Sequence, residues 1–138
     1  MNQRIRVAAA VIIRDGLVLI GRRKEGRFLG MWENQGGKVE PGETDEEALV
    51  RELHEELGVE STVGQPLAAF YFDYSSRVGH CVITFYRVEI TGDPAPLCHD
   101  RLLWVDAPLL YILNFTPASH LVRELLYDML RQDPWATR

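Results

Sequence analysis

The feature that most constrains the fold is a helix with clear boundaries in the middle of the chain, over Thr44–Leu57. Thr44 and Glu47 mark its start, because each of these side chains can bind the backbone N–H group of the other residue in a capping box. Leucines repeat every four residues along it, at Leu49, Leu53 and Leu57. Gly58 follows, and glycine favours the left-handed conformation that ends many helices. A helix with one apolar stripe must pack against another layer, so the sequence predicts a layered domain.

The residues before this helix predict a β-hairpin. The segment Arg6–Ile13 is rich in Val, Ile and Ala, Asp15-Gly16 is a two-residue turn signal, and Leu17–Gly21 continues as the second strand. The longest apolar run, Val7–Ile13, is far shorter than the roughly 20 residues of a membrane helix. Charge on both sides of this run favours a buried strand over a secretory signal.

The residues after the central helix predict three more strands and a second helix. The strands are expected over Leu67–Tyr74, His80–Ile90 and Leu102–Val105. Pro117 opens the second helix, because a missing N–H costs nothing in the first turn, and Asp133-Pro134 ends it. Its buried face is expected to consist of Leu121, Leu125 and Met129, flanked by Val122 and Leu126. Strands mixed with two helices predict a single α/β domain over residues 1–138.

Charge and cysteine content exclude several classes of protein. The net charge of −5 argues against a protein that binds polymeric nucleic acid, which usually has a basic surplus. It does not argue against an anionic substrate, because divalent cations on carboxylates invert the local charge. Cys81 and Cys98 have no metal-binding spacing and are too few to staple the domain, so we expect a cytoplasmic protein without a membrane role. Monomer and homodimer both stay open.

Three glutamates share the polar face of the central helix. Glu52, Glu55 and Glu56 are spaced three and four residues apart, so their carboxylates are neighbours that repel each other unless positive charge lies among them. Ion pairing with Arg51 would explain part of this, at only about 0.3–0.5 kcal/mol. Gly36-Gly37 precedes the helix, and backbone carbonyls can approach closely there. Hard oxygen ligands suit Mg²⁺, so this face is a candidate two- or three-ion site for phosphoryl chemistry.

The segment Gly37–Val59, with the sequence GKVEPGETDEEALVRELHEELGV, resembles the Nudix box, G-x5-E-x7-R-E-U-x-E-E-x-G-U, where U is a bulky apolar residue. Every specified position is filled. With each of the seven fixed residues at about 7%, a chance match at one position is roughly 10⁻⁸. Outside the box, the first hairpin, Trp32-Glu33 before the double glycine, Trp104, and Pro117-Ala118 before the last helix resemble the MutT-like branch.

The resemblance implies a Nudix fold, with a mixed β-sheet between helices, and a nucleoside triphosphate pyrophosphohydrolase that uses Mg²⁺ or Mn²⁺ and releases a nucleoside monophosphate and pyrophosphate. The implied metal ligands are the carbonyl of Gly37 and the carboxylates of Glu52, Glu55 and Glu56. Arg51 would orient a glutamate through charge-assisted hydrogen bonds. Glu52 is the first candidate to help deprotonate the attacking water, and Glu43 is the second.

The substrate-binding residues follow less directly. Arg22 and Arg23, at the end of the second strand, are candidate phosphate ligands, although a solvated arginine is the ordinary alternative. Asn34 and Ser119 are candidates for the base pocket. Both depart from the family, which usually has Trp-Glu-Phe-Pro before the box, where this chain has Trp32-Glu33-Asn34-Gln35, and an asparagine at the place of Ser119 in the enzyme that removes oxidised guanine nucleotides.

A further departure concerns a glutamate outside the box that MutT-like enzymes carry six residues before the last tryptophan. Cys98 occupies that position, with His99 and Asp100 as neighbouring substitutes. The base therefore stays open between an 8-oxo-dGTP-like and a CTP- or dCTP-like substrate. Two alternatives to a triphosphate substrate are another diphosphate, such as a dinucleotide, nucleotide sugar or ADP-ribose, and a non-catalytic nucleotide-binding module. The retained box glutamates argue against the module.

Overall fold

The structure, a computed structural model, describes residues 4–75 and 79–132. Within these ranges the elements follow in the order β1 (Arg4–Arg14), β2 (Leu17–Arg23), β3 (Trp32–Glu33), β4 (Gly36–Lys38), α1 (Asp45–Leu57), β5 (Glu60–Ser75), β6 (Gly79–Thr91), β7 (His99–Val105), the 3-10 helix η1 (Pro108–Tyr111) and α2 (Pro117–Gln132). None of the helices in this described part is long and apolar enough to cross a membrane.

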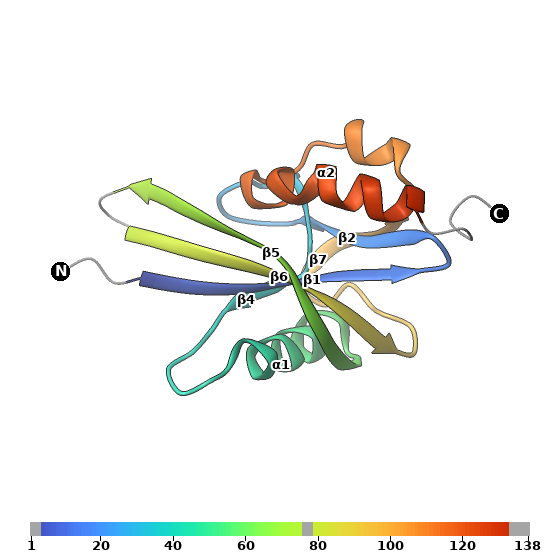
Figure 1. The fold of residues 1–138 in the computed structure, drawn as a ribbon. Helices are drawn as coiled ribbons and strands as arrows, with labels where there is room; N and C mark the ends of the chain where they lie inside the picture. The colour runs from blue at the N-terminus through green and yellow to red at the C-terminus, as the bar shows by residue number, and fades with distance from the viewer. Residues whose placement is uncertain (1–3, 76–78, 133–138) are drawn as a thin grey trace.

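The strands form one mixed sheet that separates the two α-helices, with α1 on one face and α2 on the other (Figure 1). The sheet has the order β3-β2-β1-β6-β5, while β4 also pairs with β1 and β7 with β2. The β1–β6 pair is parallel and the other pairs are antiparallel. The predicted α/β fold with a mixed sheet between helices is confirmed.

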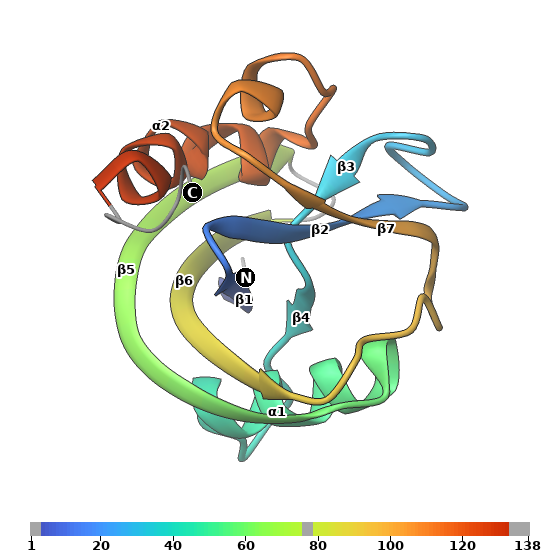
Figure 2. The same ribbon diagram turned by 90° about the vertical axis from the view of Figure 1, so that its right-hand side faces the viewer.

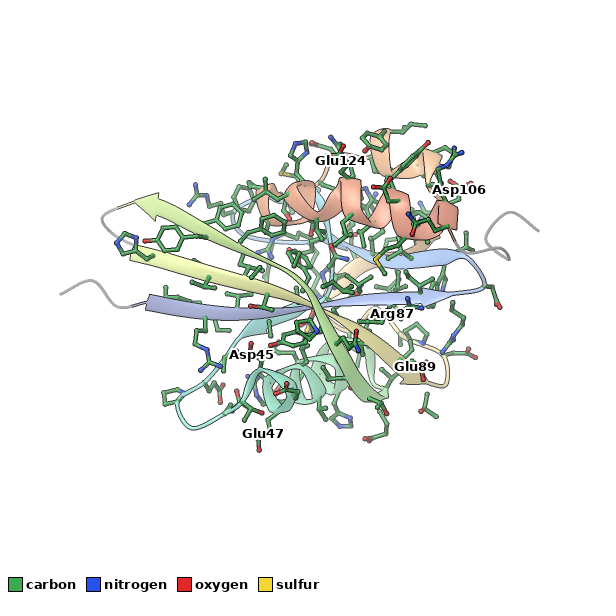
Figure 3. All side chains as sticks on the ribbon, in the orientation of Figure 1. Asp45, Glu47, Arg87, Glu89, Asp106 and Glu124 are labelled. Carbon is green, nitrogen blue, oxygen red and sulfur yellow. The ribbon has the colours of Figure 1, made fainter. Side chains whose placement is uncertain are left out.

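Strand β1 is buried on both faces, which explains its continuous apolar sequence. Alternate residues point to opposite sides of a strand. Ala8, Ala10 and Ile12 belong to the core against α1, whereas Ala9 and Val11 belong to the core against α2. Side chains accordingly fill the space on both sides of the sheet (Figure 3).

The long strands β5 and β6 curve around the molecule, so that β5 contacts both α1 and α2 (Figure 2). Strand β1 pairs with β6 along Arg4–Ile12. On its other edge, residues 7–9 pair with β4 and residues 13–14 pair with β2. Because β4 takes this place beside β1, the residues just before the predicted metal-binding helix lie next to the centre of the sheet.

The predicted central helix is confirmed together with its caps. The Glu47 backbone N–H donates to Thr44 Oγ1 at 3.1 Å, and the Thr44 backbone N–H donates to Glu47 Oε1 at 2.9 Å. Gly58 closes the helix in the left-handed conformation, with φ of 70°. The Asp15-Gly16 turn also has positive φ at both residues, as its sequence predicts.

The predicted buried face of α2 is confirmed at its flanking residues Val122 and Leu126 and wrong at its centre. Val122, Leu126 and Leu130 are the buried apolar residues, while the side chain of Leu121 is 43% exposed. Leu125 and Met129 pack only at the margin of the core. Strand β5 is longer than predicted and begins at Glu60. The predicted end of the helix at Asp133-Pro134 lies outside the described residues, as do residues 76–78 between β5 and β6.

Candidate active site

The backbone of β4 and the side chain of Glu52 on α1 lie in direct contact. A Cβ atom placed on Gly37 would be 2.5 Å from Glu52 Cδ and 2.7 Å from both carboxylate oxygens, closer than real Cβ atoms approach. The preceding residue, Gly36, has φ of 149°, and a Cβ atom there would lie 2.2 Å from the carbonyl oxygen of Ala8. Both glycines are therefore required by close packing, which brings a backbone segment and a carboxylate together.

Arg51 organises the carboxylates around this contact. Its Nε and NH2 groups donate to the two oxygens of Glu43 at 2.8 and 2.9 Å, and its NH1 group donates to Glu52 Oε1 at 2.8 Å. Glu55 Oε2 lies 3.6 Å from NH1. The hydrogen bonds from Arg51 lower the pKa of Glu43 to about 2. Glu43 therefore anchors Arg51 as a carboxylate, and Arg51 also holds the carboxylate of Glu52.

Glu56 is the buried member of the glutamate trio, with 7% of its surface exposed. Burial, and after it the hydrogen bond and negative charge of Glu52, raise the pKa of Glu56 well above its ordinary value, and the charge of Glu33 adds to this. A buried carboxylate beside another carboxylate is costly to ionise, and a bound cation reverses that preference. The electrostatics of this pair therefore favour positive charge between Glu52 and Glu56.

The donor set fits a hard divalent cation that shares its coordination with a substrate. In the described part of the chain, no group of three His, Cys, Asp or Glu side chains is gathered closely enough to hold an ion by itself. Mg²⁺ is usually bound through one or two carboxylates, with waters and substrate phosphates as the other ligands. Glu52 and Glu56, with the backbone of Gly37 against Glu52, provide such a set. The side chain of Glu55, the third glutamate of the trio, is 56% exposed.

These glutamates line a cavity of about 250 Å³, which we call the carboxylate cavity. Its walls are formed by Arg23, Lys24, Glu25, Glu33, Gly36, Glu52, Glu56, Cys98 and His99. Both basic and acidic groups are present, so the cavity offers ligands for phosphate groups as well as for cations.

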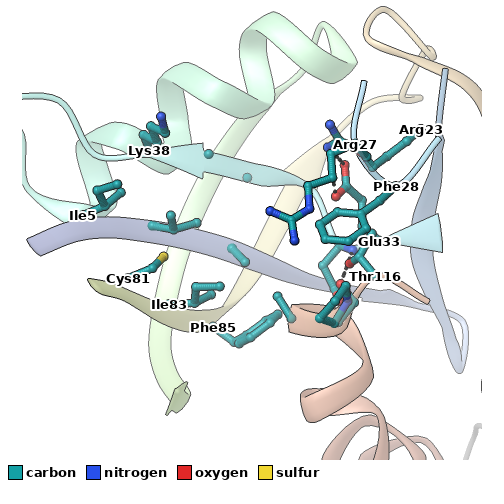
Figure 4. Close-up of a pocket in the computed structure, with 18 residues that line it drawn as sticks. Ile5, Arg23, Arg27, Phe28, Glu33, Lys38, Cys81, Ile83, Phe85 and Thr116 are labelled. Carbon is teal, nitrogen blue, oxygen red and sulfur yellow. Dashed lines mark hydrogen bonds and ion pairs between the residues drawn. The ribbon is translucent and has the colours of Figure 1, made fainter. Parts of the chain in front are cut away.

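A second cavity of about 330 Å³ lies between the sheet and the start of α2, and we call it the apolar cavity (Figure 4). Ile5, Ile83, Phe85 and Phe28 are among its labelled walls, with Thr116 at the end nearest α2. Asn34 and Ser119 also line it. The Asn34 backbone N–H donates to Ser119 Oγ at 3.0 Å, which joins the segment before β4 to the first turn of α2.

Arg23, Glu33 and Gly36 line both cavities, so the two spaces share a wall. Glu33 Oε2 lies 3.0 Å from His99 Nε2 and 3.2 Å from Arg23 NH1. Glu33 was not predicted to face the substrate, and His99 was considered only as a substitute for the missing glutamate outside the box. Glu33 was named only as part of the Trp-Glu dipeptide, and its contact with His99 joins residues 66 positions apart.

Comparison with known proteins identifies the chain. The NUDIX domain family matches residues 4–124.

The chain belongs to the Nudix family.

Relatives and solved structures agree with this membership. The chain is 49% identical over 101 residues to the CTP pyrophosphohydrolase of Escherichia coli, covering 72% of this chain and 74% of that one. It is 36% identical over 133 residues to the 8-oxo-dGTP diphosphatase of Haemophilus influenzae, covering 93% and 96%. The solution structure of the E. coli ORF135 protein matches with a TM-score of 0.81 at 32% identity, covering 96% and 94%. A MutT Nudix hydrolase from Burkholderia pseudomallei matches with a TM-score of 0.77 at 28% identity, covering 88% and 97%. The predicted Nudix fold, MutT-like resemblance and hydrolase class are confirmed.

The structure separates the three residues that were weighed as replacements for the missing glutamate outside the Nudix box. Cys98 is exposed and lines the carboxylate cavity. Partial desolvation and the negative charge of the box glutamates raise the pKa of this thiol. His99 is buried against Glu33. The carboxylate of Asp100 accepts a hydrogen bond from Arg22 at 2.8 Å, and Asp100 lines neither the apolar cavity nor the carboxylate cavity of the described structure.

The two candidate phosphate-binding arginines also differ in position. Arg23 lines both cavities. Arg22 pairs with Asp100, and its guanidinium lies 5.5 Å from the ring centre of Trp32. Adjacent residues of β2 point to opposite sides of the strand, so one arginine faces the site of this Nudix domain and the other faces away from it.

Proposed function

We propose that this Nudix protein is a Mg²⁺-dependent nucleoside triphosphate pyrophosphohydrolase that releases a nucleoside monophosphate and pyrophosphate. The observation that carries the proposal is the shared wall between two unlike cavities. An apolar cavity of about 330 Å³ suits a nucleoside, and the adjoining carboxylate cavity suits phosphates with their cations. A molecule that occupies both has an apolar end and a polyanionic end joined within a few ångströms.

The Gly37 carbonyl and the carboxylates of Glu52, Glu55 and Glu56 would hold Mg²⁺ or Mn²⁺. When bound, the metal lowers the pKa of a coordinated water and neutralises charge on the attacking and leaving oxygens. Glu52 would accept the proton of the attacking water. Arg51 fixes the Glu52 carboxylate for this task through its 2.8 Å hydrogen bond, and Glu43 in turn fixes Arg51. We therefore propose Glu52 as the base, with Glu43 holding Arg51 in place.

The remaining candidate residues belong to substrate binding. Arg23 is part of the shared wall and would bind a phosphate on the side of the carboxylate cavity. Asn34 and Ser119 would contact the base in the apolar cavity. Asn34 is 6% exposed, and among the described residues neither polar atom of its side-chain amide has a hydrogen-bond partner. A buried amide without partners is costly, which supports a role for a ligand here. Arg22 would act at most indirectly, through Trp32 and Asp100.

The substrate is a small nucleotide and not polymeric nucleic acid, in keeping with the net charge of −5. Relatives named for CTP and for 8-oxo-dGTP support a triphosphate of either class, so nucleotide-pool sanitising is part of the proposal. We place the activity in the cytoplasm, because both Cys81 and Cys98 are free thiols.

The test is a substrate panel with the purified protein and Mg²⁺. CTP, dCTP, 8-oxo-dGTP, canonical dGTP, a dinucleoside polyphosphate, a nucleotide sugar and ADP-ribose are incubated separately, and the products are resolved by chromatography. Nucleoside monophosphate and pyrophosphate from a triphosphate are expected, with no turnover after chelation of the metal. Turnover restricted to the dinucleotide, sugar nucleotide or ADP-ribose would refute the triphosphate assignment. Tight binding with no turnover of any compound would identify a binding module instead.

A further inference from the structure

Glu33 occupies the one acidic position on the wall between the two cavities. The other two residues of this wall are Arg23 and Gly36. The side chain of Glu33 is 21% exposed, and Figure 4 shows it beside Arg23, with Arg27 and Phe28 adjacent. Any ligand that extends from the apolar cavity into the carboxylate cavity passes this carboxylate.

The Glu33 carboxylate is held from two sides. Arg23 NH1 lies 3.3 Å from Oε1 and 3.2 Å from Oε2, while His99 Nε2 lies 3.0 Å from Oε2. Because an ionised carboxylate only accepts hydrogen bonds, the His99 tautomer that matches it carries its proton on Nε2. Arg23 is itself fixed, since its Nε donates to the carbonyl oxygen of Arg27 at 3.0 Å. Glu33 therefore has little freedom to turn away from the wall.

The position of His99 depends on a glycine in the neighbouring strand. His99 is 4% exposed, and a Cβ atom on Gly21 would lie 2.7 Å from its ring. The ring thus packs against the backbone of β2, in space that a side chain on Gly21 would fill. This packing holds the imidazole where its Nε2 reaches Glu33.

The chemistry of the wall indicates which part of a nucleotide lies against Glu33. A nucleoside triphosphate with its base in the apolar cavity and its phosphates in the carboxylate cavity places its sugar between them. A carboxylate repels a phosphate, but it accepts a strong hydrogen bond from a hydroxyl group. A carboxylate oxygen accepts up to two hydrogen bonds, and the described residues give Oε1 one, from Arg23.

We propose that Glu33 is a specificity-determining residue that accepts a hydrogen bond from a sugar hydroxyl of the substrate, and that His99 is the positioning residue that holds Glu33 for this contact. The inference rests on the proposed function and narrows the substrate to nucleotides with a free sugar hydroxyl. It assigns Glu33 to the nucleoside and not to the cation.

The experiment crosses a change in the protein with a change in the sugar. Wild-type protein and the Glu33→Ala variant are compared on a deoxynucleoside triphosphate and on its 2′,3′-dideoxy counterpart, with the base that the substrate panel selects. Wild-type kcat/KM is expected to be about 10- to 100-fold lower on the dideoxy compound, the range for a hydrogen bond to a charged group. The ratio of kcat/KM on the deoxy compound to kcat/KM on the dideoxy compound falls to near one in Glu33→Ala, because the substitution affects only the compound that has the hydroxyl. Glu25→Ala removes the same charge from the wall of the carboxylate cavity and keeps the wild-type ratio.

His99 is tested through the same ratio. His99→Ala lowers it, whereas His99→Gln, whose side-chain NH₂ can replace Nε2, restores part of it. A merely structural role would lower activity on both compounds equally. Thermal unfolding of each variant verifies folding.

Two further readouts separate this inference from the proposed function. The dissociation constants of the corresponding deoxy and dideoxy nucleoside monophosphates, measured by calorimetry, report on the hydroxyl contact without turnover. Mn²⁺ affinity reports on the metal site and is expected to fall no further in Glu33→Ala than in Glu25→Ala, which removes the same charge from the same cavity. Equal losses on both sugars in Glu33→Ala, or Mn²⁺ binding much weaker than in Glu25→Ala, would overturn the sugar assignment while leaving pyrophosphohydrolase activity in place. A wild-type protein that cleaves no triphosphate, yet binds the deoxy monophosphate more tightly than the dideoxy one, would refute only the proposed function.

Discussion

Arg51 separates two glutamates that the Nudix pattern marks equally. Glu43 receives two hydrogen bonds from Arg51 and lines neither cavity of the described structure, whereas Glu52 receives one and faces the carboxylate cavity. The Arg51 guanidinium is therefore held in place by Glu43 and in turn holds Glu52 at the carboxylate cavity. At the scale of single residues, this asymmetry gives two different expectations for two glutamates.

Glu52→Gln is expected to lower kcat by about 10²-fold or more, because it removes both a proposed metal ligand and the proposed acceptor of a proton. The fold stays intact, since the substitution preserves the shape of the side chain. Steady-state kinetics on the best triphosphate measure the effect. Glu46→Gln makes the same chemical change on an exposed position of α1 and serves as the matched control. Wild-type rates in Glu52→Gln would refute its assignment.

Glu43 is expected to make stability depend on acidity. Its pKa falls from the ordinary 4.5 to about 2 in the folded protein, chiefly through hydrogen bonds from Arg51. A lowered pKa contributes stability that is fully present above the unfolded value of 4.5 and is lost as the pH falls through about 2. The difference in unfolding free energy between wild type and Glu43→Gln should therefore shrink as the pH is lowered across this window. Urea unfolding at a series of pH values measures it, and a constant difference would contradict the assignment.

At the scale of elements, α1 carries the glutamates of the proposed metal site, and its sequence specifies both of its ends. Its start depends on the reciprocal hydrogen bonds of Thr44 and Glu47. Its buried leucines pack in the core on one face of the sheet, while the Glu52 side chain contacts the backbone of Gly37 in β4. The cap therefore helps to fix the position of the α1 glutamates relative to β4.

Thr44→Ala is expected to destabilise the protein by about 1 kcal/mol, since it removes the acceptor of the capping bond. For a domain of this size that corresponds to a melting temperature lower by roughly 2–5 °C. Thermal unfolding measures the shift. Thr44→Ser retains the hydroxyl and should stay close to wild type, so an equal loss in both variants would show that the methyl group, and not the cap, is responsible.

The two helices show what a sequence can predict about elements. The turn, caps and leucine spacing of α1 are all local, so its bounds were readable. In α2, two apolar rows satisfy the same four-residue spacing, one through Leu121 and one through Val122. Packing against the sheet selects the row through Val122 and leaves Leu121 exposed. Strand β5 begins at the polar residue Glu60 because pairing with β6 continues that far, which no local pattern reveals.

The site divides in the same way. The residues of the Nudix box follow one spacing rule within 23 consecutive positions, Gly37–Val59, so the sequence alone groups them. Glu33 and His99 meet because β2 pairs with β3 on one edge and with β7 on the other. That proximity is a property of the sheet and leaves no signal in either segment.

At the scale of the whole molecule, the sheet divides the interior into two cores. Ile12 of β1 belongs to the core against α1, and Leu126 of α2 belongs to the core on the other face. Both side chains are almost completely buried. The backbone of the sheet lies between them, so they share no packing partner on the same face.

Ile12→Val is expected to cost about 0.5–1.5 kcal/mol and Leu126→Ala about 2–5 kcal/mol of unfolding free energy. In the double variant these costs should add to within about 0.5 kcal/mol, as they do for sites without shared partners. Denaturant unfolding of the four proteins provides the cycle. A larger interaction energy would show that a change in one core propagates through the sheet to the other.

The two cysteines are distributed between the cavities in a way that gives the site its own chemical reporters. Cys81 is buried and lines the apolar cavity, whereas Cys98 is exposed and lines the carboxylate cavity. Alkylation by a small thiol reagent thus reads the two halves of the site separately, with Cys98 reacting first. Under the proposed function, a nucleoside would shield the Cys81 sulfur, and a cation with phosphates would shield the Cys98 sulfur. Mass spectrometry of the alkylated wild-type protein measures the extent of modification at each cysteine, and so reports the order in which the nucleotide and the metal bind.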